Sequence, residues 1–183
     1  MAAEVTCLPN DGETVAVLET EKGDIVVRFY PEHAPMHAAN FQELVSEGFY
    51  DGTRFHRCIA GFMVQGGDPN SKDLTRYGTW GTGAKVVNGV ERRLKAEFNS
   101  LKHTRGVLSA ARSQHPDTAS SQFFIMVANS PHLDRQYSGF GEVVSGMDVV
   151  DEIVKVGDVN NNGKVAAADA VEIRSARLAT WPL

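Results

Sequence analysis

Hydrophobic and polar residues alternate with a period of two near the start of the chain. Val15 and Val17 fall on alternate positions, residues 21–24 (Glu-Lys-Gly-Asp) supply turn formers, and Ile25 and Val27 resume the alternation. Alternation of this kind is typical of β-strands, and turn residues between two such runs indicate a hairpin. We therefore expect the chain to begin its folded part with two antiparallel strands.

Two later segments have the spacing of amphipathic helices instead. Phe41, Leu44 and Val45 lie at i, i+3 and i+4, and Gly48 follows as a C-terminal stop signal. This pattern predicts a helix over about residues 36–47. A similar spacing predicts a second, shorter helix, carried by Met147, Val150, Ile153 and Val154.

The remaining apolar runs are short and read as strands separated by turns. They cover residues 54–58, 62–66, 95–98, 106–112, 122–128, 140–144 and 171–178, and a glycine-rich loop spans residues 66–89. Many short strands with two isolated helices favour a closed antiparallel barrel with caps over a βαβ sheet. We expect one domain over residues 14–183, preceded by a polar tail over residues 1–13.

Composition narrows the possible partners and location. The chain has 183 residues and a formal net charge of −5, which disfavours binding to nucleic-acid phosphates. It has no apolar run of the ~20 residues that a membrane helix needs, and its N-terminus lacks the pattern of a secretory signal. Two cysteines, Cys7 and Cys58, do not form a disulfide framework. We therefore expect free thiols and a cytoplasmic protein without nucleic-acid or membrane partners.

The candidate catalytic and binding residues are most concentrated in residues 55–68 (Phe-His-Arg-Cys-Ile-Ala-Gly-Phe-Met-Val-Gln-Gly-Gly-Asp). Strand alternation could bring Arg57, Phe62, Met63 and Gln65 toward one surface. Such a surface would combine a guanidinium, an amide and two large apolar side chains.

These residues resemble the signature of the cyclophilin family. The matching pieces occur in the family's order over roughly residues 14–156, at residues 55–57, 61–68, 108–111, 121–125 and 140–144. The resemblance implies an all-β fold, a closed eight-stranded antiparallel β-barrel capped by two α-helices, with the active groove on its outer face. It also implies peptidyl-prolyl cis/trans isomerase activity, which assists protein folding and needs no cofactor.

Prolyl isomerisation twists an amide bond against a barrier of ~18–20 kcal/mol. The twisted proline nitrogen loses its conjugation and gains an available lone pair. A hydrogen-bond donor aimed at that nitrogen binds the transition state better than the substrate. Arg57 suits this role, because its guanidinium is always charged and carries several donors in a rigid fork. We therefore expect Arg57 to be catalytic.

The resemblance assigns the other site residues. It implies that Gln65 binds substrate or positions Arg57, and that an apolar pocket and a groove edge hold the peptide. The implied substrate-binding residues are Phe62, Met63, Gly81, Ala111, Arg112, Gln122, Phe124, His132, Leu133 and Tyr137. The implied partners are proline-containing peptides and unfolded proteins, bound by a monomer.

Three residues are those of bacterial rather than many eukaryotic members of the family, namely Arg112, His132 and Tyr137. Many eukaryotic members have Trp where this chain has His132, and that Trp contributes to cyclosporin binding in the family. We therefore expect cyclosporin to bind weakly while isomerase activity is retained.

The segment 158–169 departs most from the family and could be a calcium-type loop inserted before the last strand. Asp158, Asn160, Asn162 and Asp169 occupy ligand positions 1, 3, 5 and 12 of a calcium-binding loop. Against this interpretation, two of the four are amides and position 12 holds Asp instead of Glu. Asn-Gly turns before strands are also common for conformational reasons. We expect no metal and keep the calcium loop as the alternative.

Two other function classes fit parts of the chain. A proline-peptide binding or scaffold module would need the apolar pocket and little catalysis, so Arg57 favours the enzyme. A hydrolase is disfavoured, because the chain has no Gly-x-Ser-x-Gly motif.

Overall fold

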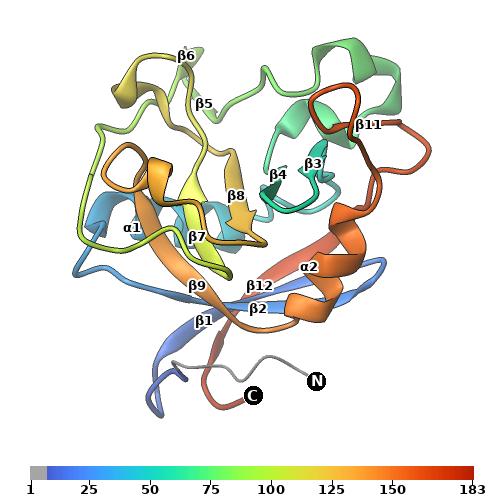
Figure 1. The fold of residues 1–183 in the computed structure, drawn as a ribbon. Helices are drawn as coiled ribbons and strands as arrows, with labels where there is room; N and C mark the ends of the chain where they lie inside the picture. Colours follow the sequence, from blue (N-terminus) through green and yellow to red (C-terminus); the bar gives the residue numbers. More distant parts are fainter. Residues whose placement is uncertain (1–7) are drawn as a thin grey trace.

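The described part of the chain, residues 8–183 of a computed structural model, is built around one ten-stranded antiparallel sheet (Figure 1). Its strands are β1 (Thr14–Thr20), β2 (Gly23–Phe29), β3 (Arg57–Ile59), β4 (Met63–Gly66), β7 (Val107–Ala110), β8 (Phe123–Met126), β9 (Gly139–Ser145), β10 (Gly157–Asp158), β11 (Lys164–Val165) and β12 (Ile173–Thr180). They are hydrogen-bonded in the order β10-β11-β3-β4-β8-β7-β9-β2-β1-β12. β5 (Val86–Val87) and β6 (Val90–Glu91) form a separate hairpin.

The predicted N-terminal hairpin is confirmed. Simple alternation implies one apolar and one polar face, whereas both faces of this hairpin carry buried apolar side chains. β1 pairs with β2 in a register that sets Val17 opposite Val26. Ala16 and Leu18 point into the main core, whereas Val15 and Val17 pack in a second apolar cluster on the outer face. Trp181 packs against that cluster. Both faces of the hairpin are therefore buried, which explains why its polar alternation is weak.

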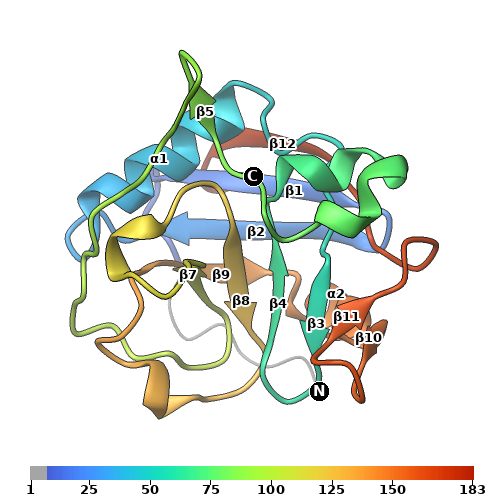
Figure 2. The same cartoon turned by 90° about the horizontal axis from the view of Figure 1, so that it is seen from above.

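Both predicted helices are present, and they cover different parts of the sheet. α1 (Pro35–Ser46) packs against β12 and β9 through its apolar face, while α2 (Met147–Val154) packs against β2, β3 and β4. Figure 2 shows the two helices on opposite sides of the core, with the sheet bent between them. Four short 3₁₀ helices lie in the loops, at η1 (Pro69–Lys72), η2 (Leu74–Thr79), η3 (Pro116–Thr118) and η4 (Pro131–Leu133).

The prediction of a closed eight-stranded barrel is wrong, because the ten strands pair in an open order with β10 and β12 at its edges. A closed barrel would need a continuous ladder between β3 and β12. A strand has two edges, and those of β3 are taken by β4 and by β11. The segment before β3 reaches β12 through an isolated bridge between Arg54 and Glu172.

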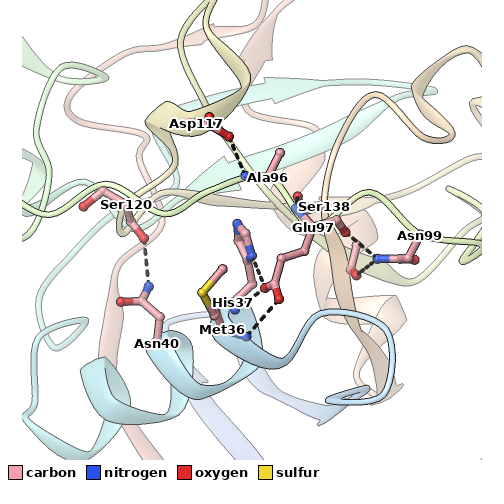
Figure 3. Close-up of polar contacts among 10 residues, drawn as sticks. Met36, His37, Asn40, Ala96, Glu97, Asn99, Asp117, Ser120 and Ser138 are labelled. Carbon is pink, nitrogen blue, oxygen red and sulfur yellow. Dashed lines mark hydrogen bonds and ion pairs between the residues drawn. The ribbon is translucent and has the colours of Figure 1, made fainter.

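Residues 95–98 do not form the strand that their apolar pattern predicted. This segment crosses the N-terminus of α1, and side chains accept its backbone N–H groups in place of a neighbouring strand (Figure 3). Ala96 N donates to Asp117, and Glu97 N donates to Ser138 Oγ. The carboxylate of Glu97 in turn accepts from Met36 N at 3.2 Å and His37 N at 2.8 Å, and it contacts His37 Nδ1 at 2.6 Å. Glu97 therefore caps α1, whose own N-cap residue provides no side-chain acceptor.

We expect Glu97→Gln to lower the free energy of unfolding by about 1–2 kcal/mol, because it removes a negative charge that lies largely buried at a helix N-terminus. Urea unfolding measures the change. Glu43→Gln is the control, since Glu43 makes a more exposed ion pair with Arg92 and should change stability by less than about 1 kcal/mol. Equal effects of the two substitutions would contradict the capping role.

The segment before β1 is bonded to the sheet from residue 8 onward. Arg28 donates to the Glu13 carboxylate at 2.8 Å and 3.0 Å, and Gly12 N donates to Trp181 O. Residues 1–7, which include Cys7, lie outside the described residues, so a tail over 1–13 stays a prediction there. Cys58 is a free, buried thiol, and burial raises its pKa to about 12. Within residues 8–183, every helix is too short or too polar to cross a bilayer.

Candidate active groove

The β3–β4 hairpin places two polar side chains of the predicted site side by side. Arg57 is paired with Gln65 across the two strands, and Cys58 is paired with Val64. Directly paired residues of antiparallel strands share a face, and successive residues alternate between faces. Cys58 and Val64 enter the main core, so Arg57 and Gln65 lie on the outer face.

A groove of about 850 Å³ runs over this outer face. It collects every predicted site residue except Gln122, which lines an adjoining hollow of about 380 Å³. The groove is lined by His56, Arg57, Phe62, Met63, Gln65, Trp80, Gly81, Ala111, Arg112, Phe124, His132, Leu133, Gln136, Tyr137, Asn161, Asn162 and Lys164.

One end of the groove is apolar. Met63, Phe124 and Leu133 belong to one hydrophobic cluster, and Phe62 and Tyr137 pack against it. The Tyr137 ring meets Phe124 edge-on at 5.6 Å between centroids. His132, on the 3₁₀ helix η4, lies with its ring 6.0 Å from that of Phe62. These contacts form an aromatic and aliphatic pocket beside Arg57.

A chain of side-chain amides connects Arg57 to the glycine-rich loop. Arg57 Nη1 lies 3.5 Å from Gln65 Oε1, and Gln65 Nε2 donates to Gln122 Oε1 at 3.0 Å. Gln122 Nε2 then donates to the carbonyls of Gly81 and Gly83 at 3.0 Å and 2.9 Å. Each amide is therefore oriented by the next one, and the loop backbone fixes the last.

The loop itself is held by the fully buried carboxylate of Asp68. That carboxylate accepts hydrogen bonds from Asn70 N, at 2.8 Å, and from Gly81 N. Gly81 has a φ of +97°, which favours glycine, and an ideal Cβ on Gly83 would lie 2.0 Å from Asp68 Oδ1. The backbone conformation at Gly81 and the packing of Gly83 against Asp68 therefore explain two glycines of this loop.

The opposite wall is formed by Ala111 and Arg112. Ala111 N donates to the Gln122 carbonyl at 3.0 Å. Arg112 donates to the carbonyls of Ser113, Gln114 and Gln136, and its guanidinium carbon lies 4.5 Å from the centroid of the Tyr137 ring. Arg112 therefore ties two loops together at the groove edge.

Sequence reasoning missed one close partner of Arg57. Arg57 Nη2 donates to Asn162 Oδ1 at 3.0 Å, and Arg57 Nε donates to the Asn162 carbonyl at 3.2 Å. Trp80, Gln136, Asn161 and Lys164 were missed as groove residues as well. The Asn-Gly pair at Asn162 signals a turn in the sequence, but it carries no information on which strand the turn meets.

The first part of the possible calcium loop, from Asp158 to Val165, lies in the hairpin of β10 and β11. Asp158 Oδ1 accepts from Asn160 N, and Gly163 N donates to the Asp158 carbonyl. Asn162, a ligand in the calcium interpretation, contacts Arg57 instead. Among the described residues, no three His, Cys, Asp or Glu side chains are grouped to hold a metal ion. The absence of a metal stays a prediction, and the calcium loop stays the alternative to it.

A serine, a histidine and an aspartate lie in line behind the apolar pocket. His103 Nε2 lies 2.9 Å from Ser109 Oγ, and His103 Nδ1 lies 3.3 Å from Asp134 Oδ1. Ser109 is completely buried and His103 is 2 % exposed, so no substrate carbonyl can reach the serine. The His103 ring stacks on Phe124 at 6.1 Å. The three residues therefore support the pocket and do not form a hydrolase site.

Two buried histidines should make the free energy of unfolding depend on pH. Burial lowers the pKa of His56 and of His103 below the ordinary value of 6.5. Between those folded-state values and 6.5 the unfolded chain binds more protons, so we expect the free energy of unfolding to fall as the pH drops below about 6.5. Urea unfolding between pH 5.5 and pH 7.5 measures this slope. His103→Gln should reduce the slope, and the control His115→Gln, at an exposed position, should not.

Comparisons with known proteins show which family the chain is similar to. The family model described as cyclophilin type peptidyl-prolyl cis-trans isomerase matches residues 15–178. A Brucella abortus protein named "Probable peptidyl-prolyl cis-trans isomerase" is 40 % identical over 177 residues, covering 93 % of this chain and 86 % of the relative. An Arabidopsis thaliana peptidyl-prolyl cis-trans isomerase is 44 % identical over 139 residues, covering 75 % and 81 % respectively.

The fold also matches a solved structure. A Cryptosporidium parvum cyclophilin type peptidyl-prolyl cis-trans isomerase, crystallised in the presence of the dipeptide Ala-Pro, superimposes with a TM-score of 0.77 and 29 % identity. The match covers 91 % of this chain and 99 % of the Cryptosporidium chain.

Proposed function

The chain belongs to the cyclophilin-type peptidyl-prolyl cis-trans isomerases, and from this premise we propose that Arg57 stabilises the twisted state of the X-Pro bond. The predictions of family and of isomerase activity are confirmed by the comparisons. The observation that carries the residue assignment is that the Arg57 guanidinium shares the groove with the apolar side chains, whereas the other guanidinium in the groove, that of Arg112, is held by backbone carbonyls and the Tyr137 ring.

The apolar end of the groove receives the proline ring. Met63, Phe124 and Leu133 are each less than a tenth exposed, and Phe62, His132 and Tyr137 surround the opening. An apolar pocket holds a saturated ring by burying its surface. The Cryptosporidium relative crystallised with Ala-Pro supports a proline peptide as the occupant.

Arg57 acts on the proline nitrogen as the acyl side rotates. The reaction breaks no bond and transfers no proton, so the enzyme gains by holding the ring still and by donating to the nitrogen once conjugation is lost. Gln65 holds one side of the guanidinium, the Gln122 amide holds Gln65, and the Gly81 carbonyl holds Gln122. An aligned donor of this kind avoids reorganisation at the moment of reaction.

The peptide backbone runs along the wall made by Ala111 and Arg112, as an extended strand does when it lies against a sheet edge. Because the groove contacts the proline ring and the peptide backbone, the proposed substrates are unfolded and flexible chains. The proposed enzyme is a monomer whose isomerase domain covers residues 14–183. Cyclosporin should bind weakly, because His132 offers less apolar surface than the Trp of many eukaryotic relatives. The cytoplasmic location stays a prediction.

Titration of the ¹⁵N-labelled protein with a short Ala-Pro peptide tests the proposed groove. We expect backbone amide signals of Met63, Ala111 and Phe124 to shift with peptide concentration. Signals of Val15 and Ala179, which pack with Trp181 in the second apolar cluster, should stay in place and serve as the control. Shifts confined to the Trp181 face would contradict the assigned site.

A further inference from the structure

Arg57 makes its shortest hydrogen bonds to Asn162 and not to Gln65. The two Asn162 contacts measure 3.0 Å and 3.2 Å, whereas the Gln65 contact measures 3.5 Å. The guanidinium therefore has a primary partner that comes from a segment more than a hundred residues away in sequence.

The backbone of Asn162 explains how one residue can offer two acceptors. Its φ of 52° lies in the left-handed region, which asparagine tolerates better than most residues. In this conformation its side-chain Oδ1 and its carbonyl oxygen both reach the same guanidinium. Two acceptors for neighbouring donors match the planar fork of arginine and fix its plane as well as its position.

The hairpin that carries Asn162 is closely docked on the strand that carries Arg57. Lys164 pairs with Arg57 in the sheet, and Cys58 N donates to the Gly163 carbonyl at 2.8 Å. An ideal Cβ on Gly157 would lie 1.7 Å from the Cys58 carbonyl oxygen, and one on Gly163 would lie 2.7 Å from the same oxygen. Two glycines thus allow backbone contact, so the hairpin is a defined support for the Asn162 side chain.

We propose that Asn162 is a positioning residue for the isomerase reaction, which it serves by holding the guanidinium of Arg57 in place. A guanidinium has five N–H groups. Asn162 and Gln65 engage three of them, which leaves two on the terminal nitrogens for the peptide. The inference rests on the proposed role of Arg57, and it gives the β10–β11 hairpin a catalytic purpose in place of a calcium-binding one.

Loss of the Asn162 side chain should therefore lower kcat more than it raises KM. Substrate binding depends mainly on the apolar pocket, while transition-state stabilisation depends on the direction of the Arg57 donors. The Asn162→Gly variant suits the left-handed backbone and removes Oδ1 without added strain. Its matched control is Asn88→Gly, because Asn88 also precedes a glycine in a hairpin turn, with a φ of 51°, outside the groove.

The experiment measures isomerisation of a short Ala-Pro peptide by exchange NMR with the full-length chain, at several peptide concentrations. We expect Asn162→Gly to lower kcat about tenfold, equivalent to about 1.4 kcal/mol, with KM changed less than about twofold. Asn162→Asp keeps an oxygen at the Oδ1 position, so its kcat should lie closer to wild type than that of the glycine variant. Asn88→Gly should leave both constants unchanged.

The side-chain Nη2–H signal of Arg57 provides a second readout, because Nη2 donates to the Asn162 Oδ1 that the glycine variant lacks, whereas the backbone carbonyl that accepts from Nε is kept. We expect Asn162→Gly to shift the Nη2–H signal and to speed its exchange with water, while Asn88→Gly leaves it in place. A wild-type kcat in Asn162→Gly, with an unchanged Nη2–H signal, would overturn the inference. If Arg57→Ala abolished turnover in the same assay, the proposed function would stand and the inference alone would fail. If Arg57→Ala kept full turnover, the proposed function itself would fail.

Discussion

Arg57→Ala should lower kcat/KM for an Ala-Pro peptide by about 100- to 1000-fold, the usual effect of removing one transition-state donor. The substitution removes the guanidinium beside the proline pocket and leaves the pocket itself intact, because Met63, Phe124 and Leu133 pack in their own cluster. Peptide affinity should therefore fall by less than about tenfold. Exchange NMR measures the isomerisation rate. The affinity is measured from the backbone amide signals of the protein, which shift as the peptide concentration rises.

Arg57→Lys provides the graded variant. Lysine keeps a positive charge but presents a single ammonium in place of a planar fork, so it cannot make the two contacts to Asn162 and the contact to Gln65 together. We expect Arg57→Lys to recover a minor part of the lost rate. Full recovery would mean that charge alone suffices. Turnover retained in Arg57→Ala would show that Arg57 is not the catalytic donor, even though the groove binds proline.

The elements with strong local signals were predictable from the sequence. The spacing of Phe41, Leu44 and Val45 identified α1, and all three side chains are buried beneath it. The hairpin of β1 and β2 followed from its turn at residues 21–24. The residues assigned to the site line one groove, apart from Gln122, although their roles stay predictions.

The features that sequence reasoning missed all depend on contacts between distant segments. The apolar pattern of residues 95–98 suggested a strand, but the acceptors for its N–H groups are the side chains of Asp117 and Ser138. The number of short strands favoured a closed barrel, but β11 occupies the edge of β3. Asn162 was noticed only for a short-range pattern that fits a calcium loop, whereas its contact with Arg57 joins segments 105 residues apart.

Successive side chains of strand β8 point to opposite faces, so that one phenylalanine packs in the core and the next lines the groove. Phe123 and Phe124 are adjacent and both almost fully buried, at 1 % and 5 % exposed. Phe123 points into the main core, where its ring lies 5.2 Å from Phe41 and 5.4 Å from Tyr50. Phe124 points the other way, into the cluster that forms the apolar end of the groove.

Phe123→Ala should lower the free energy of unfolding by about 3–5 kcal/mol, the usual cost of a cavity left by a buried phenylalanine. Because a domain of this kind has a total stability of about 5–15 kcal/mol, the variant should unfold at a clearly lower urea concentration. Its folded molecules keep the groove, since Phe123 does not line it. Measured at low temperature and corrected for the folded fraction, kcat/KM should stay within about threefold of wild type.

Phe124→Ala should give the opposite balance between the two measurements. The groove loses one wall of its apolar pocket, and the burial of a large apolar side chain by a ligand is worth about 1.5–3 kcal/mol, so kcat/KM should fall about 10- to 100-fold per folded molecule. Stability should fall as well, because Phe124 also packs on Tyr137 and His103. The decisive comparison is therefore activity per folded molecule. Equal values for the two variants would mean that Phe124 serves as core alone and that the proline ring binds elsewhere in the groove.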